Sequence, residues 1–331
     1  MRIWLNHWFS TAYHFINMLK AAGYYVVSSN EKENCVYKTV CNEFYAEPIC
    51  SSSEYIEWCL YFCKEHNIDV FFPKKNIESI MQSMKKFEDI GVTVVCERNI
   101  EMFDILNKKS TTIDFFKNNS ICKIPEYRLV SSVEEFKQSY SELSPLGPLC
   151  IKYDKDEGGN SFKSIITKEK EPNLHRLREF PENGLSYDYI IRCLETAETF
   201  KDIIVMPYLE GPEVSIDCLG FKDDLVAVSR CKESRRFTRI MMNKELTDIA
   251  KKFYLAAKLD GPFNMQLRYN NGELFLLEVN TRLSGGCWKD KLVGCDFPVL
   301  CVEKFTNQLK KLPDICFPSV TIGNIEEALI V

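Results

Sequence analysis

The chain has 331 residues, of which 45% are hydrophobic and 27% are charged, and its formal net charge is -5. That length suffices for two or three packed units with substantial cores, and the composition is typical of a globular protein. The negative charge, together with the lack of a basic stripe interleaved with aromatic residues, argues against a nucleic-acid partner.

The cysteines and the N-terminus bear on the compartment. Fifteen cysteines are scattered along the chain without any CxxC pair, which is typical of packed thiols in a reducing environment. The stretch MRIWLNHWFS at the start lacks the apolar core of a signal peptide, and no apolar run approaches the ~20 residues of a transmembrane helix. We therefore expect a cytoplasmic protein that does not associate with membranes.

Residues 1–106 alternate between strand and helix patterns, which predicts a parallel sheet with crossover helices. No GxGxxG fingerprint follows the first strand, so a nicotinamide site is not expected. His7 and Ser10 follow that strand, at the edge where parallel sheets form binding crevices; helix capping and substrate contact both remain open for them. The expected strands cover residues 3–6, 24–28, 69–72 and 92–96, and the expected helices cover residues 10–22, 52–65 and 76–89.

Lysines and a glycine-containing loop between residues 107 and 167 form a pattern that could bind phosphate groups. Lys109 precedes a short helix, with Lys108 as the competing choice. Lys152 lies inside the apolar strand at 149–153, where a cation needs an anion to offset its desolvation. The following loop contains Gly158, Gly159 and Ser161, and its glycines allow backbone N–H groups to approach phosphate oxygens. A solvated lysine pair and an ordinary hairpin are the alternative interpretation.

An apolar strand at 203–206 is followed by the sequence Pro207-Tyr208-Leu209, and Glu213 comes four residues after Leu209. Two adjacent antiparallel strands are expected next, at 214–220 and 225–230. Residues 168–201 are polar and helical in tendency. A basic cluster then forms either a solvated face or an anion contact; its members are Arg230, Lys232, Arg235, Arg236 and Arg239.

A helix at 246–259 precedes a hairpin whose strands cover residues 261–269 and 273–280. The second strand ends in Glu278 and Asn280, which share one face because side chains alternate along a strand. We predict a three-residue loop, Asn270 to Gly272, because it puts Asn264 opposite Glu278 and Gln266 on the same face. A two-residue Asn271-Gly272 loop would put Gln266 on the other face. Carboxylate and amide oxygens are ligands that Mg²⁺ accepts.

The stretch ELFLLEVNTRLSGG at 273–286 resembles the metal- and phosphate-binding signature of the ATP-grasp superfamily of ATP-dependent carboxylate–amine ligases, which includes carbamoyl phosphate synthase-like proteins. The lysines and the 203–213 segment occur in the order that the family requires, so the resemblance covers most of the chain. It implies a mixed α/β and α+β ATP-grasp fold. The implied parts are a Rossmann-like pre-ATP-grasp domain at 1–106, a small lid subdomain at 107–205 and a C-terminal subdomain at 206–331.

The resemblance also implies roles for single residues, with ATP and Mg²⁺ or Mn²⁺ as cofactors. The implied metal ligands are Gln266, Glu278 and Asn280. The implied catalytic residues are Arg282, which holds the transferred phosphoryl group or an oxyanion, Lys152 and Asn264. The implied nucleotide contacts are Lys109, Lys152, Gly158, Gly159, Ser161, Pro207, Tyr208, Leu209 and Glu213. Met206 departs from the pattern, because the family usually has a glutamate there that contacts adenine.

Such a protein phosphorylates a small carboxylate to an acyl phosphate and couples it to an amine, releasing ADP and phosphate. Small acids and amines, amino acids among them, are the expected substrates. Two alternatives stay open: activation of bicarbonate, as in carbamoyl phosphate synthase-like relatives, and nucleotide binding without turnover, as in a regulator. Homodimers are common among such enzymes, although no sequence feature marks an interface here.

Overall fold

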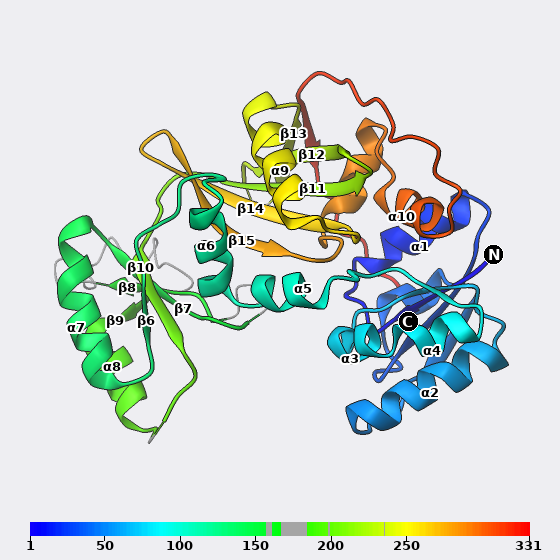
Figure 1. Ribbon diagram of the computed structural model, residues 1–331, viewed down its shortest axis with the longest axis horizontal. Helices are drawn as coiled ribbons and strands as arrows, with labels where there is room; N and C mark the ends of the chain where they lie inside the picture. Colours follow the sequence, from blue (N-terminus) through cyan, green and yellow to red (C-terminus); the bar gives the residue numbers. More distant parts are fainter. Residues whose placement is uncertain (157–160, 167–183, 198, 235) are drawn as a thin grey trace. The chain divides into compact units, whose positions relative to one another are not determined.

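The computed structural model describes residues 1–156, 161–166, 184–197, 199–234 and 236–331. The chain forms two compact units (Figure 1). Unit 1 contains Met1–Asp104, Val214–Gln266 and Val279–Val331, and unit 2 contains Ile105–Glu213 and Leu267–Glu278. Because the boundary passes through one hairpin twice, each unit is described by itself.

Unit 1 begins with the predicted parallel sheet, whose strand order is β3-β2-β1-β4-β5. All four neighbouring pairs are parallel. Trp4 anchors its core, since the indole is fully buried and stacks on Phe71 with ring centroids 4.0 Å apart. The strands are β1 (Arg2–Asn6), β2 (Tyr25–Asn30), β3 (Glu43–Ala46), β4 (Val70–Phe72) and β5 (Thr93–Val94).

The helices of this sheet follow the predicted alternation, but η1 and α5 were not predicted and one predicted helix is divided. The predicted helix at 76–89 is two helices, because the chain breaks at Ser83, which is the C-cap of the first and the N-cap of the second. A capping box of Ser51 and Glu54 starts the predicted helix at 52–65 where expected. The helices are α1 (Ala12–Ala21), η1 (Val36–Thr39), α2 (Ser52–Glu65), α3 (Ile77–Gln82), α4 (Met84–Asp89) and α5 (Ile100–Leu106).

A second sheet has the strand order β15-β14-β11-β12-β13-β16. The predicted antiparallel pair is confirmed, with β11 beside β12. Helix α9 packs on this sheet so closely that a Cβ added at Gly220 would lie 2.0 Å from the Tyr254 ring. The elements are β11 (Glu213–Phe221), β12 (Asp224–Lys232), β13 (Phe237–Met241), α9 (Lys244–Ala257), β14 (Phe263–Asn270), β15 (Glu273–Asn280), η5 (Cys287–Val293), α10 (Phe297–Phe305) and β16 (Val320–Gly323).

Unit 2 contains a five-stranded sheet of order β6-β10-β7-β8-β9. Helices α7 and α8 cover one of its faces, and their apolar side chains form a common core with β7 and β10 (Figure 1). The elements are α6 (Lys109–Asn118), β6 (Arg128–Val130), α7 (Val133–Leu143), η2 (Ser144–Leu146), β7 (Leu149–Tyr153), β8 (Lys163–Ile166), β9 (Gly184–Ser186), α8 (Tyr187–Glu195) and β10 (Ile203–Pro207).

The loop of the central hairpin differs from the prediction. Strand β14 ends at Asn270 and β15 begins at Glu273, so only Asn271 and Gly272 lie between them. Their φ angles are 50° and 81°, and positive φ at both central residues is the mark of a type I′ two-residue loop. The predicted three-residue loop is therefore wrong, because Asn271 itself adopts the left-handed conformation, which asparagine tolerates better than most residues.

This correction removes the basis for pairing Asn264 with Glu278. Strict alternation from a two-residue loop would put Gln266 and Glu278 on opposite faces. Burial along β15 does not keep strict alternation, however, because Leu276 is buried and the next buried residue is Val279. The pattern changes phase just where Glu278 lies, so the loop alone does not fix the face of its side chain.

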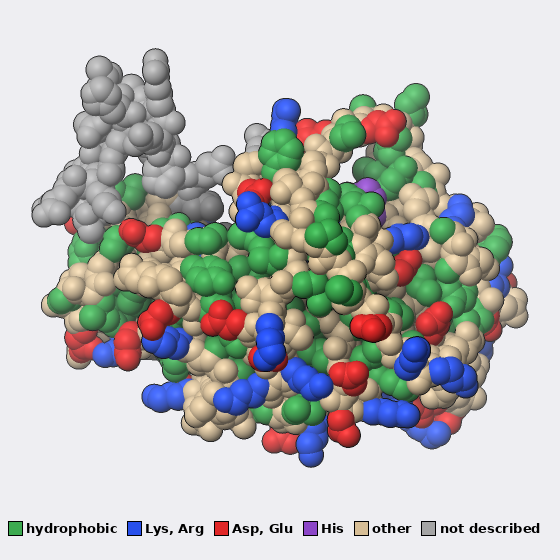
Figure 2. Space-filling model, turned by 90° about the horizontal axis from the view of Figure 1, so that it is seen from above, with side chains coloured by type: hydrophobic (Ala, Val, Ile, Leu, Met, Phe, Trp, Pro, Cys, Tyr) green, Lys and Arg blue, Asp and Glu red, His purple; other side chains and the backbone are tan. Residues whose placement is uncertain are grey.

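The surface and the cysteines agree with the sequence-based expectations for a globular chain. Basic and acidic side chains are interspersed on the face seen in Figure 2. Each of the fifteen cysteines is a free thiol. Within the described ranges, the structure has no helix that is both long and apolar enough to cross a membrane.

Candidate nucleotide-binding site

Two lysines and one glutamate meet in unit 2. The Lys109 ammonium lies 3.9 Å from the Glu278 Oε2 atom and donates a 2.8 Å hydrogen bond to the carbonyl of Asp156. The Lys152 ammonium donates to the carbonyl of Leu277 at 3.3 Å. Burial lowers the pKa of Lys152, and the Glu278 carboxylate opposes that shift. Three predicted site residues from α6, β7 and β15 thus form one charged cluster.

Asp154 fixes the position of Lys109 at the start of α6. It follows β7 directly and is 4% exposed. Its carboxylate accepts hydrogen bonds from the Ser110 N–H at 2.7 Å and the Ser110 hydroxyl at 2.9 Å, and its carbonyl accepts from the Lys109 N–H at 3.0 Å. These contacts tie the first turn of α6 to the end of β7. Lys108 is the N-cap residue of that helix and its side chain makes no capping hydrogen bond, so Lys109 is the member of the lysine pair that the structure brings to Glu278.

An apolar cluster lies beside these charges, formed by side chains of β7, β10 and β15 and of the segments that flank the strands of the sheet. Met206 is 2% exposed and packs within it. Because a thioether offers no strong hydrogen bond, the cluster presents an apolar surface where the family pattern has a glutamate. The buried members are Cys150, Ile204, Met206 and Leu209, and the partly buried members are Tyr127, Phe162, Tyr208, Phe275 and Leu277.

Arg268 holds the segment that follows β10, and sequence analysis did not identify it. Its Nε donates to the carbonyl of Gly211 at 2.9 Å, and its terminal nitrogen donates to the Tyr208 hydroxyl at 3.3 Å. The guanidinium also lies 5.1 Å from the centroid of the Tyr208 ring. Its signal in the sequence is a charged side chain within the predicted strand at 261–269, two residues after Gln266.

A cavity of about 660 Å³ opens beside this segment in unit 2. Pro207 and Leu209 belong to its lining, together with Phe275 of β15. The two lysines that contact Glu278 or Leu277 are not part of that lining, so the cavity and the charged cluster are separate features of the unit.

Ser161 and Glu213 are further residues predicted to contact the nucleotide. The Ser161 hydroxyl accepts from the Tyr153 N–H at 3.0 Å, and its own N–H donates to Asp156 at 3.0 Å, so it closes the loop after β7. Glu213 begins β11 and is exposed. The predicted contacts Gly158 and Gly159 lie outside the described residues, as do residues 167–183 of the polar segment.

The predicted residues of unit 1 form their own contacts. One Arg282 nitrogen donates to Asn280 Oδ1 and another to the Leu283 carbonyl, both at 3.3 Å. Asn264 is fully buried and donates to the Asp217 carboxylate at 2.8 Å, which points to an orienting role for its amide.

The implied metal ligands are divided between the units. Gln266 and Asn280 belong to unit 1, and Glu278 belongs to unit 2. One carboxylate and two amide oxygens are a donor set that suits Mg²⁺, which keeps its other positions for water and phosphate. No group of three His, Cys, Asp or Glu side chains suited to a metal exists in the part of the chain that the structure describes, so the mixed set stays a prediction.

The carboxyl edge of the parallel sheet carries a second group of polar side chains. Glu47 has no exposed side-chain surface; it accepts from the Ser29 hydroxyl at 2.9 Å and lies 3.9 Å from the Lys75 ammonium. The Nδ1 atom of His7 lies 3.8 Å from the same carboxylate, and the His7 backbone is left-handed with φ 47°. Ser10 is exposed. This edge lies where parallel sheets bind ligands, at the switch in strand order between β1 and β4.

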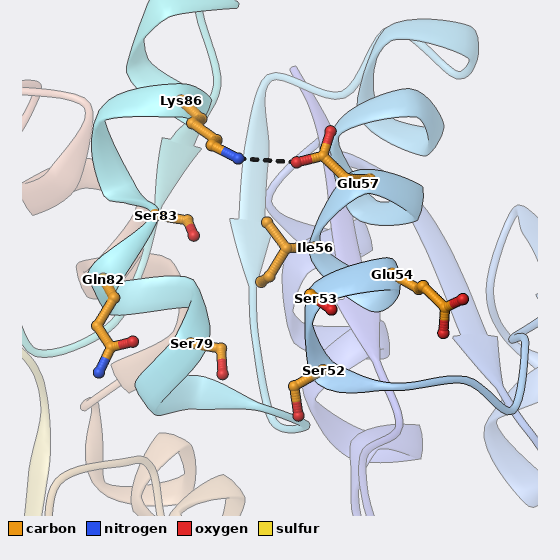
Figure 3. Close-up of a pocket in the computed structure, with 9 residues that line it drawn as sticks. All are labelled: Ser52, Ser53, Glu54, Ile56, Glu57, Ser79, Gln82, Ser83 and Lys86. Atoms are coloured by element: carbon orange, nitrogen blue, oxygen red, sulfur yellow. Dashed lines mark hydrogen bonds and ion pairs between the residues drawn. The ribbon is translucent and has the colours of Figure 1, made fainter.

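A cavity of about 730 Å³ in unit 1 lies between α2 and the α3–α4 pair (Figure 3). Serine hydroxyls line it, and Lys86 donates to Glu57 across one end at 2.7 Å. None of the predicted site residues lines this cavity.

Comparison with solved structures identifies the fold. The N5-carboxyaminoimidazole synthetase of Staphylococcus aureus with ADP superposes with a TM-score of 0.70 at 16% identity, covering 98% of this chain and 82% of the other. The biotin carboxylase of Campylobacter jejuni in complex with β-γ-ATP gives 0.69 at 14% identity, covering 95% and 72%. The chain has the ATP-grasp fold.

Other comparisons agree with this ATP-grasp assignment. The biotin carboxylase domain of the Hydrogenobacter thermophilus 2-oxoglutarate carboxylase, with MgADP, ADP and bicarbonate, gives a TM-score of 0.67 at 15% identity, covering 94% of this chain and 70% of the other. Residues 199–327 match the family described as ATP-grasp in the biosynthetic pathway with Ter operon. That range contains the 273–286 signature, so the resemblance found in the sequence is confirmed. No curated protein matches the chain by sequence.

Proposed function

We propose that the protein is an ATP-dependent ligase that joins a small carboxylate to an amine through an acyl phosphate. The observation that carries this proposal is the cluster of Lys109, Lys152 and Glu278 within an ATP-grasp fold. Two cations suit the inner phosphates of a nucleotide, and a carboxylate beside them suits a phosphate-bridging metal.

The residues divide the chemistry as follows. Lys109 and Lys152 neutralise phosphate charge, which matters because phosphoryl transfer needs positioning and charge neutralisation rather than covalent help from the protein. Bound Mg²⁺, held by the ligands predicted above, would polarise the terminal phosphate. Arg282 offers the fork of donors that matches a phosphoryl group or a tetrahedral oxyanion.

Bonds and charges balance in both steps. A substrate carboxylate oxygen attacks the terminal phosphorus, an O–P bond forms, and the bond to the ADP oxygen breaks. The amine nitrogen then attacks the acyl carbon, phosphate leaves with the C–O bond electrons, and the amine proton passes to water. The products are an amide, ADP and phosphate.

Bicarbonate activation is the second candidate function. It is favoured by the structural likeness to a carboxylase domain whose crystals contain bicarbonate. The same lysines and metal ligands would serve this reaction, because bicarbonate is also a carboxylate-type oxygen nucleophile.

The test is release of ADP and phosphate from MgATP by the purified protein. Pools of amino acids and other small acids are supplied with and without amines, and bicarbonate is supplied alone. Release that requires both an acid and an amine would support the ligase, and release with bicarbonate alone would support the second candidate. MgATP binding without stimulated release in any pool would favour a nucleotide-binding regulator instead.

Glu278→Ala is the matched variant for this assay. We expect a loss of about 10²–10³ in turnover, because the change removes a group that acts on developing charge. The fold should persist, since the Glu278 side chain is not fully buried but 19% exposed; circular dichroism checks this. Activity above about a tenth of the wild type would contradict metal ligation by Glu278.

A further inference from the structure

Unit 1 contains a buried ion cluster that the chemistry above does not use. Arg230 of β12 pairs with Asp217 of β11, and its Nε lies 3.2 Å from Asp290 Oδ1 of η5. The three residues are 7%, 1% and 0% exposed. Among the described members of the predicted basic cluster, Arg230 alone is buried, while Lys232, Arg236 and Arg239 are exposed.

Arg230 contacts the end of the ATP-grasp signature. Its terminal nitrogen donates to the Ser284 hydroxyl at 2.8 Å, and the same hydroxyl accepts from the Gly286 N–H at 3.2 Å. A Cβ added at Gly286 would lie 1.9 Å from the other terminal nitrogen. The guanidinium therefore packs directly against the backbone of the glycine loop, and a side chain there would displace it.

The same cluster extends to a predicted metal ligand. The Asp217 carboxylate accepts from the Asn264 amide nitrogen at 2.8 Å, and Asn264 also donates to the Ser215 hydroxyl at 2.8 Å. The amide nitrogen of Gln266 donates to Asn264 Oδ1 at 3.5 Å. This contact orients the Gln266 amide so that its nitrogen faces Asn264 and its oxygen points elsewhere.

A purely structural role explains this arrangement poorly. A buried ion pair is weak support for stability, because desolvation offsets most of the attraction, and apolar replacements are often as stable. Here two carboxylates share one guanidinium, and burial raises the pKa of Asp290 well above its usual range. What the charges do provide is fixed geometry: a planar fork with donors aimed at Asp217 and Ser284.

We propose that Arg230 is a positioning residue which, held by Asp217 and Asp290, fixes the Ser284–Gly286 loop and, through Asp217 and Asn264, the amide of Gln266. The proposal rests on the proposed function for its effect on turnover. Groups behind metal ligands typically change metal affinity or activity by 10–100-fold when altered.

Arg230→Lys tests this, because it keeps the charge and removes the fork. We expect the Mg²⁺ concentration for half-maximal ADP release to rise about tenfold and kcat to fall about tenfold or more. KM for ATP at saturating Mg²⁺ should stay within about twofold, since the lysines that face the nucleotide lie in unit 2. Gly286→Ala should give the same pattern, because its Cβ displaces the guanidinium.

Arg128→Lys is the matched control, because Arg128 pairs with Glu142 at the surface of unit 2 and should leave Mg²⁺ dependence unchanged. A merely structural Arg230 would lower the melting temperature without changing the Mg²⁺ dependence of the folded enzyme, and that result overturns the proposal. If Arg230→Lys does not fold, the Mg²⁺ dependence of Gly286→Ala is measured instead, and an unchanged dependence overturns the proposal.

Failure of the proposed function is recognised separately, as a wild type that releases no ADP with any acid, amine or bicarbonate. In that case the Mg²⁺ dependence of ADP binding is measured by calorimetry. A higher Mg²⁺ requirement in Arg230→Lys then supports the positioning role, and an equal requirement overturns it.

Discussion

At the scale of single residues, Lys152 is the side chain whose environment most demands a ligand. It lies within β7 beside an apolar cluster, and burial lowers its pKa. Glu278 opposes this shift but does not cancel it. Under the proposed function, the phosphates of the nucleotide would supply further negative charge to this buried cation. Function and stability therefore oppose each other at this position.

The variant Lys152→Met should separate the effect of this lysine on stability from its effect on nucleotide binding. Because the folded-state pKa of Lys152 lies below the unfolded value of ~10.4, the unfolded state binds more protons between those values, and the free energy of unfolding rises with pH across that window. Below the lowered pKa both states are protonated and the burial penalty is present in full. We expect the variant to lose this pH-dependent rise and, without nucleotide, to melt no lower than the wild type near neutral pH.

Thermal melts at several pH values, with and without MgADP, measure both effects. MgADP should raise the melting temperature of the wild type and of the exposed control Lys155→Met, but much less that of Lys152→Met. A variant that melts lower than the wild type near neutral pH and keeps the full MgADP shift would mean that Lys152 is structural.

The sequence indicated the residues whose chemistry conflicts with their local pattern, such as Lys152 in an apolar strand and Glu278 at a strand end. It did not indicate the residues that hold them. Asp154 and Ser110 are 44 positions apart, and Arg230 and Ser284 are 54 apart. Such pairs are set by tertiary packing, which periodicity does not encode. The signal available in the sequence was a charged side chain within each of two predicted strands, Arg230 in β12 and Arg268 in β14.

At the scale of elements, several periodic segments were predicted and others were not. Strands β1, β2 and β4 and helix α2 match the expected ranges closely, whereas helix α7 and the four-residue strands β3 and β16 were missed. The hairpin loop differs from the prediction because the three-residue loop was inferred from the strand face that a metal site requires. Local turn chemistry decided instead, since Asn-Gly favours the type I′ conformation.

Gly272→Ala tests that loop. Gly272 has φ 81° and open space around an added Cβ, so the change introduces backbone strain without a clash. We expect a loss of about 1–2 kcal/mol in the free energy of unfolding, measured by urea denaturation. Asn271→Gly, which relieves the left-handed strain at the preceding position, should be near neutral. Equal stability of Gly272→Ala and the wild type would contradict the type I′ assignment.

At the scale of the whole molecule, the residues of the proposed reaction are divided between two units. Lys109 and Lys152, which we propose to contact the nucleotide, lie in unit 2, while Arg282 and the buried Arg230 cluster lie in unit 1. The chain passes from one unit to the other within the hairpin that carries Gln266 and Glu278. Under the proposed function, affinity for the nucleotide and rate of the chemical steps should therefore respond to changes in different units.

Arg282→Lys in unit 1 should lower kcat by about 10²–10³, because lysine cannot replace two donors of a fork aimed at developing charge. The dissociation constant for ADP should remain within about twofold. Lys152→Met in unit 2 should instead act mainly on binding, so that the dissociation constant for ADP rises. Calorimetric titration with ADP and steady-state ADP release, measured on both variants, give the two quantities separately. If Arg282→Lys weakens ADP binding as much as Lys152→Met does, nucleotide binding and the chemical steps are not separated between the two units. Arg282 then contacts the nucleotide and not the transferred phosphoryl group.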